Sequence, residues 1–369
     1  AWCVGADTHG QLGAGGSSHL VPTRVSGEFL ALSVNAFNTC AIDVAGKPAC
    51  AGSNLTAQIG DGTYDTRVRL TTPDTAVTGW TAIVAGKSHV CASTSGTRYC
   101  WGANYFGQYG SGNITEAQRP VAIGPVYSRT AAVEHGCGLA GGSMWCWGYN
   151  GFGQVGNVTQ TNEPAPYMLA LTNVTDLGVG TEHTCALDGT GKAWCWGRGY
   201  EGQLGIGAAG VATSPAPVSQ TASGMFESIA AGTSHTCARA LDHRLWCWGA
   251  NDSGQLGVGD SMLRVLPTAL GIAEWKAIGL GDSHSCGIQM DDTLWCWGNN
   301  VRGQLGNGTR SAQFVPAKVN DDTDWLEVLA GHRHTCARKL DRSLWCWGSN
   351  DFGQLADGTA WNATPQLVP

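Results

Sequence analysis

The 369-residue chain is 43% hydrophobic and only 13% charged, and its formal net charge is −7. This composition is too apolar for a disordered chain. Because no basic cluster occurs, the chain is a poor match for nucleic acid or for an anionic membrane surface. No apolar run reaches roughly 18 residues, so we expect no membrane insertion. Ala1 stands where a methionine would begin a translated chain, and we expect a processed or trimmed N-terminus.

Residues 1–26 contain half of a unit that recurs along the chain. Cys3 follows a tryptophan, and residues 10–13 read GQLG, a sequence that returns at 254–257 with looser copies elsewhere. In EGQLGIG, at 201–207, three of seven residues are glycine, which excludes a helix and predicts a loop.

Eight cysteines recur at steps of 46 to 52 residues and indicate an internal repeat. They are Cys3, Cys50, Cys100, Cys146, Cys195, Cys247, Cys296 and Cys346. A period of about 49 residues is typical of a propeller blade of four short strands, and it is long for most helical-hairpin repeats.

The unit that contains Cys195 shows the expected elements in chain order. Residues 180–192, GTEHTCALDGTGK, predict a strand and a glycine-rich hairpin turn. Residues 193–197, AWCWG, alternate as a strand does, with both tryptophans on one face and the cysteine on the other. After the GQLG loop, PAPV at 215–218 predicts an outer strand, where proline is tolerated.

The full unit, AGxxHTCA…WCWGxNxxGQLGxG…PxxV, resembles the repeat of the regulator of chromosome condensation (RCC1) superfamily over essentially the whole chain. The resemblance implies an all-β fold, with residues 1–369 forming a single β-propeller that commonly has seven blades. The cysteine pairs depart from the best-known nuclear members and are similar to a secreted or bacterial-type subset.

The number of blades follows from the number of cysteine hairpins. Seven such hairpins favour a seven-bladed propeller, in which residues 1–26 overlap the ring closure or make an inter-subunit contact. An eight-bladed ring, completed by sequence outside the chain, and an open ring remain as alternatives.

Each hairpin carries two cysteines nine or ten residues apart around a turn. Directly opposite residues of antiparallel strands lie about 4.5 to 5.5 Å apart, which a disulfide can bridge. We expect seven intra-blade disulfides, which are Cys40–Cys50, Cys91–Cys100, Cys137–Cys146, Cys185–Cys195, Cys237–Cys247, Cys286–Cys296 and Cys336–Cys346. Fourteen paired cysteines favour an oxidising, extracellular or cell-surface location. Cys3 has no such partner, and a trimmed partner, an intermolecular bond and a buried free thiol all remain open.

A histidine stands two residues before the first cysteine in six hairpins, as in His183–Thr–Cys185. Histidine with cysteine is a zinc-ligand combination. However, these pairs fall on different blades and each cysteine has a nearer partner, so we expect no metal site. We expect each histidine to bond backbone or a neighbouring blade, as Asn38 in the same position of the first unit also could.

Seven N-glycosylation sequons suit a secreted glycoprotein. Their acceptors are Asn54, Asn113, Asn157, Asn173, Asn251, Asn307 and Asn362. Several lie in GQLG-type loops, which favour asparagine, glycine and threonine for structural reasons, so chance occurrence is the alternative.

The sequence contains no recognisable catalytic constellation, phosphate loop or dinucleotide fingerprint, and it predicts neither an enzyme nor a cofactor. The repeated His-x-Cys pair could suggest a catalytic dyad, but a disulfide leaves no thiolate. Most of the 16 tryptophans flank a cysteine and are expected to fill the interfaces between blades. One plant family of similar propellers senses ultraviolet light through tryptophans, but its GWRHT signature is replaced here by stretches such as GTEHT.

These observations predict a non-catalytic extracellular scaffold or protein-binding module. Its partner is expected to be another protein or copies of itself, as in a structural subunit of an extracellular assembly. The variable loops at 71–79 and 206–217 are the expected contact regions. A secreted inhibitor similar to the bacterial propeller that binds β-lactamase is one alternative. A guanine-nucleotide exchange factor is another, which the cysteines and the acidic balance disfavour.

Overall fold

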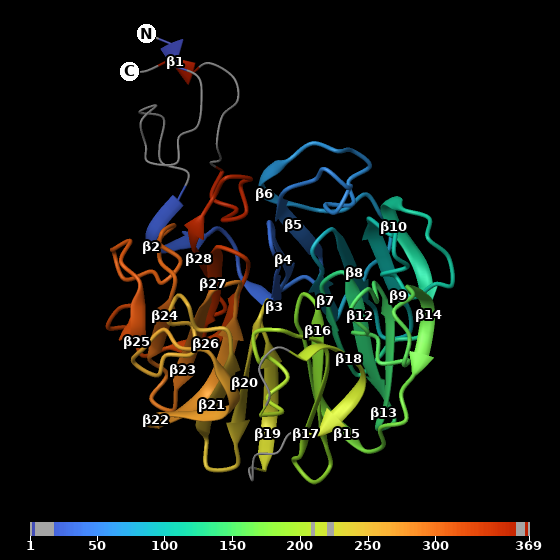
Figure 1. Ribbon diagram of the computed structural model, residues 1–369. Coiled ribbons are helices and arrows are strands. Elements are labelled where there is room, and N and C mark those ends of the chain that lie inside the picture. Colours follow the sequence, from blue (N-terminus) through green and yellow to red (C-terminus); the bar gives the residue numbers. More distant parts are fainter. Residues whose placement is uncertain (1, 4–17, 208–210, 220–224, 359–365, 368–369) are drawn as a thin grey trace.

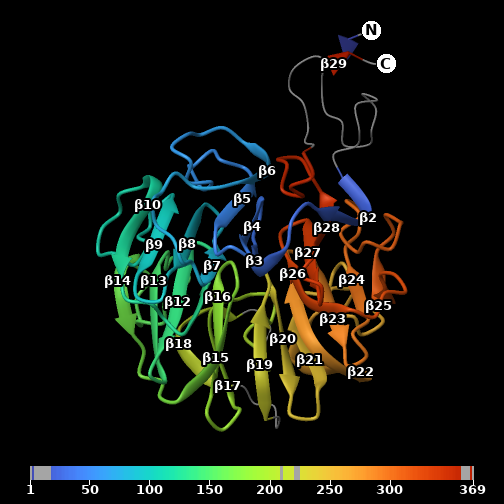
Figure 2. The same cartoon turned by 180° about the vertical axis from the view of Figure 1, so that it is seen from behind.

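The computed structural model describes residues 2–3, 18–207, 211–219, 225–358 and 366–367. The regular elements in these ranges are β-strands arranged in sheets around a central axis (Figures 1 and 2). Within the same ranges, no helix could cross a membrane.

Five separate four-stranded antiparallel sheets occur in the described part of the chain. The first contains β3 (Phe29–Val34), β4 (Asn38–Asp43), β5 (Pro48–Gly52) and β6 (Arg67–Thr71). The second contains β7 (Ala82–Ala85), β8 (His89–Ser93), β9 (Arg98–Gly102) and β10 (Ala117–Gly124). The third contains β11 (Arg129–Ala132), β12 (His135–Ala140), β13 (Ser143–Gly148) and β14 (Glu163–Met168). The fourth contains β15 (Val174–Val179), β16 (His183–Asp188), β17 (Ala193–Gly199) and β18 (Val211–Ser219). The fifth contains β26 (Trp325–Ala330), β27 (His334–Lys339), β28 (Leu344–Ser349) and β2 (Ser18–Val25).

The remaining large sheet has seven strands, because one long strand is shared between two units. Its strands are β19 (Phe226–Ala231), β20 (His235–Ala240), β21 (Arg244–Gly249), β22 (Arg264–Leu280), β23 (His284–Gln289), β24 (Leu294–Gly298) and β25 (Gln313–Lys318). The first part of β22, from Arg264 to Glu274, pairs with β21, and the last part, from Trp275 to Leu280, pairs with β23.

The predicted seven-bladed propeller is therefore wrong. In the described residues, the seven cysteine hairpins are distributed over five four-stranded blades and one seven-stranded sheet, which holds two of them. The cause is the connection between these two units, because β22 passes from its pairing with β21 to its pairing with β23 as one strand. Gly271, with a positive φ of 61°, lies at the register shift between Ala269 and Glu274.

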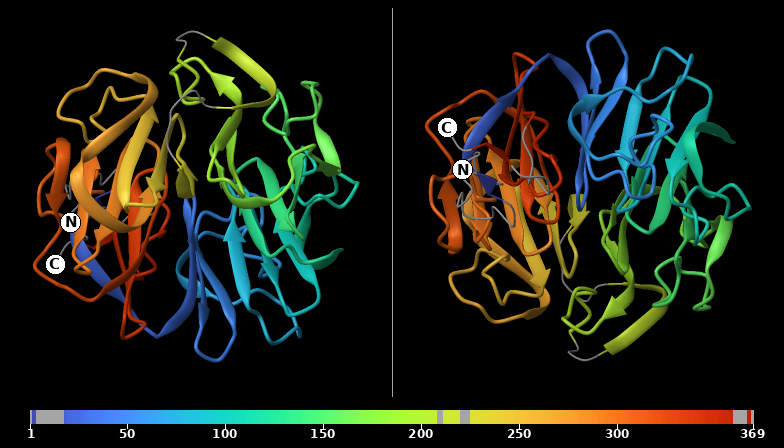
Figure 3. Two further views of the ribbon diagram at one scale, coloured as in Figure 1. Left: turned by 90° about the horizontal axis from the view of Figure 1, so that it is seen from below. Right: turned by 90° about the horizontal axis from the view of Figure 1, so that it is seen from above.

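The ring is closed by segments from opposite ends of the chain. Strand β2 pairs with β28 as the outer strand of the last unit (Figures 1 and 3). The last unit also meets the first, because the Gly358 amide donates to the Val68 carbonyl at 2.8 Å. Neither the eight-bladed ring nor the open ring describes this arrangement. Beyond the ring, the backbone of β1 (Trp2–Cys3) pairs with β29 (Gln366–Leu367).

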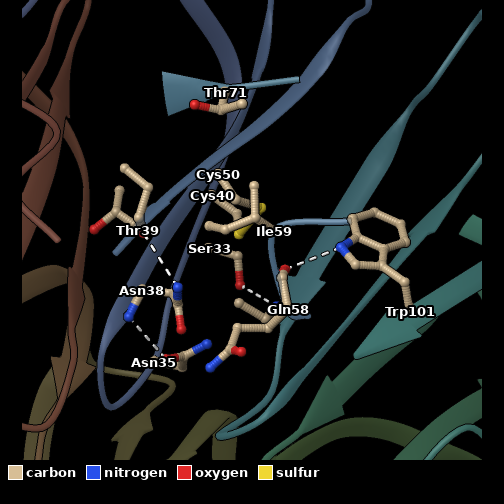
Figure 4. Close-up of a disulfide and its surroundings, with 12 residues drawn as sticks. Ser33, Asn35, Asn38, Thr39, Cys40, Cys50, Gln58, Ile59, Thr71 and Trp101 are labelled. Atoms are coloured by element: carbon tan, nitrogen blue, oxygen red, sulfur yellow. Dashed lines mark hydrogen bonds between the residues drawn. A yellow bond between two sulfur atoms is a disulfide. The ribbon is translucent and has the colours of Figure 1, made fainter. Parts of the chain in front are cut away.

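Seven disulfides cross the inner hairpins, each between directly opposite residues with Cα atoms 4.0 to 4.1 Å apart. They are Cys40–Cys50, Cys91–Cys100, Cys137–Cys146, Cys185–Cys195, Cys237–Cys247, Cys286–Cys296 and Cys336–Cys346. Figure 4 shows the first of them inside its sheet. Thirteen of the fourteen cysteines are 0% exposed, and Cys91 is 6% exposed. The sulfur atoms therefore lie in the core and not on the surface.

A repeated hydrogen-bond network joins each of the later units to the next. The Nε2 atom of His183 lies 2.9 Å from the Thr236 hydroxyl of the following unit, which donates to the Gln203 carbonyl at 3.0 Å. Trp248 donates its indole N–H to the same carbonyl at 2.9 Å. Because the threonine hydroxyl uses its proton on the carbonyl, it accepts from His183, which is therefore the neutral Nε2–H tautomer.

The same histidine-to-hydroxyl contact recurs at four other junctions, with distances of 2.7 to 3.2 Å. These contacts are His135–Thr184, His235–Ser285, His284–Thr335 and His334–Thr39. Figure 4 shows the corresponding tryptophan bond of an early unit, from Trp101 to the Gln58 carbonyl. These histidines thus contact neighbouring units, and the cysteines that follow them are bound in disulfides.

The buried histidines predict a loss of stability in acid. Burial lowers the pKa of His183 from 6.5 to about 3, and five equivalent histidines are lowered to about 3 or 4. The unfolded chain therefore binds more protons than the folded chain below about pH 6.5, so the free energy of unfolding falls as the pH drops from there towards 3. Each histidine contributes at most about 1.4 kcal/mol per pH unit in this window.

Guanidinium unfolding of wild type and His183→Asn at pH 7.5, 6.0 and 4.5 measures this effect. Asparagine occupies the equivalent position in the first unit, as Asn38. We expect the variant to lose stability with acid less steeply, by about one bound proton. Equal slopes for the two proteins would contradict this assignment.

The buried disulfides predict resistance to reductant in the native state. Iodoacetamide labelling under mild reduction, read by intact mass, should modify none of the seven pairs until the protein is denatured. Cys91 is the most exposed of these cysteines, so the Cys91–Cys100 bond should be the first to open as denaturant is added. If another disulfide is labelled first, burial does not control how easily the reductant reaches these bonds.

Candidate functional site

Two kinds of loop meet on one face of the ring, which we call the loop face. The turns before the buried histidines lie there, as do the loops that follow each second cysteine strand. In the fourth unit, the Arg198 amide at the start of such a loop donates to the Glu182 carbonyl of the turn at 2.8 Å. The turns that connect the two cysteine strands lie at the opposite ends of those strands and form the other face.

Buried amide side chains hold the GQLG-type loops in a fixed shape. Asn150, which is 0% exposed, accepts from the Val155 amide at 2.8 Å and donates to the carbonyls of Thr159 and Thr161. Gln154 accepts from the Phe152 amide at 2.9 Å. The residues between the asparagine and the glutamine are thereby presented at the surface by a loop that is already ordered.

Aromatic side chains occupy this presented position in three consecutive units. The Phe106 and Tyr149 rings have centroids 5.0 Å apart, and those of Tyr149 and Phe152 are 6.4 Å apart. The Arg198 guanidinium then lies 5.8 Å from the Phe152 centroid and 5.4 Å from that of Tyr200. We call these five residues the aromatic ladder. It continues across the junctions between the second, third and fourth units.

Carboxylates fix the cationic member of the aromatic ladder. Arg198 donates to Glu182 at 2.6 Å and to Glu201 at 2.7 Å. Burial acts to lower the pKa of this guanidinium, but the two carboxylates raise it above its usual value. Arg198 is therefore a permanent cation that is held against two rings.

A second charged pair borders the aromatic ladder near the ring axis. Lys87 Nζ lies 2.7 Å from Glu134 Oε1. Burial, together with the negative charges of Glu182 and Glu134, raises the pKa of the Tyr149 phenol. The Tyr149 phenol is thus protonated at neutral pH.

The outer end of the same surface has a different arrangement. Tyr105, next to Phe106 in its loop, is 54% exposed and donates to Glu116 at 2.8 Å. Tyr64, from the first unit, donates to the other oxygen of Glu116 at 3.1 Å. Two tyrosines from neighbouring units therefore share one carboxylate.

A central cavity of about 630 Å³ lies among the innermost strands, and Lys87 is part of its lining. Its wall is formed by the innermost strands, with Val34, Val84 and Leu280 among the apolar side chains. Near the loop face, His332 lies 3.2 Å from Asp282. Within the described residues, no cluster of three or more metal-ligating side chains occurs.

The tryptophans of the Trp-Cys-Trp strands fall into two classes. The second tryptophan of each Trp-Cys-Trp strand, such as Trp196 or Trp297, is 0 to 1% exposed and lies in the core between units. The first, such as Trp194 or Trp295, is half-buried. The side chain of Cys3 lies outside the described part of the chain.

The described sequons differ sharply in access. The Asn54 and Asn251 side chains are at most 1% exposed, and each donates to a carbonyl of its own loop at 2.9 Å. Asn157 is 8% exposed and donates to Glu163. Asn113 and Asn173 are exposed, and Asn307 is half-buried. Asn362 lies outside the described residues.

This difference predicts which sequons can carry glycans. A glycan on Asn54, Asn157 or Asn251 would replace one N–H of a buried, hydrogen-bonded amide and would have to fit inside the folded loop, so a folded protein should not carry one. Material secreted from a glycosylating host should be modified at Asn113, Asn173 or Asn307, as measured by glycopeptide mass spectrometry. Substantial occupancy at Asn54 or Asn251 in folded protein would contradict the structure.

The geometry agrees with comparisons to known proteins. Residues 140–369 match the model of the RCC1-like domain, and the chain belongs to this family of repeat propellers. Protein pim1 of Schizosaccharomyces pombe is 33% identical over 103 residues, which are 27% of this chain and 19% of that protein. The ultraviolet-B receptor UVR8 of Arabidopsis thaliana is 28% identical over 197 residues, 50% of this chain and 44% of the receptor. The chain thus spans less than half the length of either relative.

Solved structures share the fold at low sequence identity. Human WBSCR16 has a TM-score of 0.77 and 18% identity, with 89% of each chain covered. Prp20p of Saccharomyces cerevisiae, described with its binding to Gsp1p and histones, has a TM-score of 0.74 and 19% identity, covering 87% of this chain and 82% of Prp20p. These similarities establish the propeller architecture.

The aromatic ladder was not predicted from the sequence. Most tryptophans were expected in the core, and contacts were expected at 71–79 and 206–217, the second of which lies partly outside the described residues. The sequence does contain a signal for the aromatic ladder. Two residues separate the asparagine or glycine at the start of each loop from the Gly-Gln pair, and at least one of them is aromatic in the second, third and fourth units.

Proposed function

We propose that this chain is a secreted, non-catalytic propeller that binds a protein partner through its loop face. The observation that carries the proposal is the aromatic ladder, together with the exposed rings of Tyr105 and Tyr200. Tyrosine and arginine are enriched among residues that dominate protein–protein binding energies.

The loop scaffold supports the same proposal. Binding is weakened when flexible side chains and loops must be ordered. Here Asn150 and Gln154 already order the loop that presents Phe152, and Glu182 and Glu201 already hold Arg198. A partner would therefore meet a surface that needs little rearrangement.

The disulfides support an extracellular location. Structural disulfides persist in oxidising compartments and are rare in the cytosol. Seven buried disulfides in one chain, with accessible sequons at Asn113 and Asn173, suit a protein that matures in a secretory pathway. A role in protein binding also agrees with Prp20p, whose structure is described with its binding to Gsp1p and histones.

Site-specific photo-crosslinking tests the proposed binding face. A benzoylphenylalanine placed at Tyr200 should capture a partner from the extracellular fraction or the intact cells of the source. The same group at Met290 is the matched control, since this side chain is 50% exposed and lies in the β23–β24 turn on the other face. We expect adducts from position 200 only.

The identity of the crosslinked partner then distinguishes self-assembly from inhibition of an enzyme. A crosslink to a second copy of the chain would indicate self-assembly, and a crosslink to an enzyme would favour an inhibitor. Equal labelling from both positions, or from position 290 alone, would contradict the assignment of the loop face.

A further inference from the structure

We propose that the loop face takes up an arginine-bearing segment of its partner, with a guanidinium bound at Tyr105 and Glu116. This inference rests on the proposed function and deepens it, because it assigns a chemistry to the partner. It is carried by a comparison between two units of the same ring, one of which already contains such a guanidinium.

The fourth unit supplies the template. Its guanidinium, that of Arg198, lies 5.4 Å from the Tyr200 centroid and pairs with Glu201 at 2.7 Å. A cation over an aromatic face and beside a carboxylate gains from both interactions at once. The chain therefore shows that a ring and a carboxylate from this type of loop can hold a guanidinium.

The second unit has the ring and a carboxylate but lacks the cation. Tyr105 occupies the loop position of Tyr200, and Glu116 lies within 2.8 Å of its hydroxyl. Ala103 stands where the fourth unit has Arg198. Among the described residues, Glu116 accepts from two tyrosine hydroxyls and pairs with no cation. A guanidinium from outside would complete the arrangement that Arg198 completes internally.

The charge of the surrounding surface favours the same ligand. Around the aromatic ladder, the four carboxylates Glu116, Glu134, Glu182 and Glu201 outnumber the two cations Lys87 and Arg198, so these groups leave a charge of −2. Both cations are already paired with carboxylates of the chain. A basic segment would be attracted to this surface, and an acidic one would be repelled.

Arginine suits the site better than lysine. A planar guanidinium can stack on a ring while its N–H groups reach a carboxylate, whereas an ammonium is a compact and strongly hydrated charge. Tyr105 is 54% exposed, so its ring is open to such stacking. The site should therefore prefer arginine over lysine, and it should bind poorly to citrulline, which has a similar shape but no charge.

The test uses fluorescein-labelled peptides of alternating arginine and glycine, with lysine–glycine and citrulline–glycine peptides of the same length. Anisotropy titrations of the full chain are compared for wild type, Glu116→Gln, Tyr105→Ala and Tyr105→Phe. Val301→Ala is the matched control, because Val301 has the same loop position in the sixth unit and is 59% exposed. Asp252→Asn, in the equivalent position of the fifth unit, controls for the loss of one negative charge.

We expect Glu116→Gln and Tyr105→Ala each to weaken arginine-peptide binding about three- to tenfold. Tyr105→Phe keeps the ring, so its loss of affinity for the arginine peptide should be less than half of the loss caused by Tyr105→Ala. Both control variants should bind the peptide within about twofold of wild type. The citrulline peptide should bind at least about tenfold more weakly than the arginine peptide. An intact disulfide map and an unchanged melting temperature show that each variant is folded.

The proposal is overturned if wild type does not bind the arginine peptide, if the citrulline peptide binds equally well, or if the control variants lose as much affinity as Glu116→Gln. If the peptide test fails but a partner is still crosslinked at position 200, the loop face remains the binding surface and only its preference for arginine is rejected. Absence of both signals would reject the two proposals together.

Discussion

In six of the described GQLG-type loops, a buried glutamine carbonyl connects one unit to the next. In the fourth unit it is the carbonyl of Gln203, which receives one bond from Trp248 and another from Thr236 of the following unit. The side chain of the same glutamine accepts from the Glu201 amide at 3.0 Å and so fixes the exposed part of the loop. Packing between units and presentation of surface residues therefore depend on one residue, because its main chain serves the core and its side chain serves the loop face.

The network is not uniform around the ring, and it changes beneath the aromatic ladder. The third unit has Gly136 in place of the usual threonine or serine, and neither nitrogen of His89 has a hydrogen-bond partner. At the same junction, Arg98 is only 2% exposed, and its guanidinium lies 4.7 Å from the Trp147 centroid. Aromatic stacking and a buried cation thus replace the hydroxyl bridge at this position. The contact between Phe106 and Tyr149 spans the same junction at the surface.

The all-β repeat architecture was predictable from local chemistry, because alternation around a cysteine defines a strand and closely spaced glycines exclude helices. The number of separate blades was not predictable. It depends on whether the connection between two units continues as one strand, as β22 does from Arg264 to Leu280. The aromatic ladder was hidden for a related reason. Phe106 and Tyr200 look like ordinary loop residues until buried asparagine and glutamine side chains are seen to fix neighbouring loops on one face.

The closure of the ring has a consequence for biosynthesis. Each of the seven described disulfides joins cysteines nine or ten residues apart, so each hairpin can oxidise soon after it is synthesised. Strand β2, in contrast, must wait for β28, which is made more than 300 residues later. During synthesis, the early segment therefore remains an unpaired strand beside a growing row of oxidised hairpins. Until the last unit emerges, that strand is open to non-native pairing.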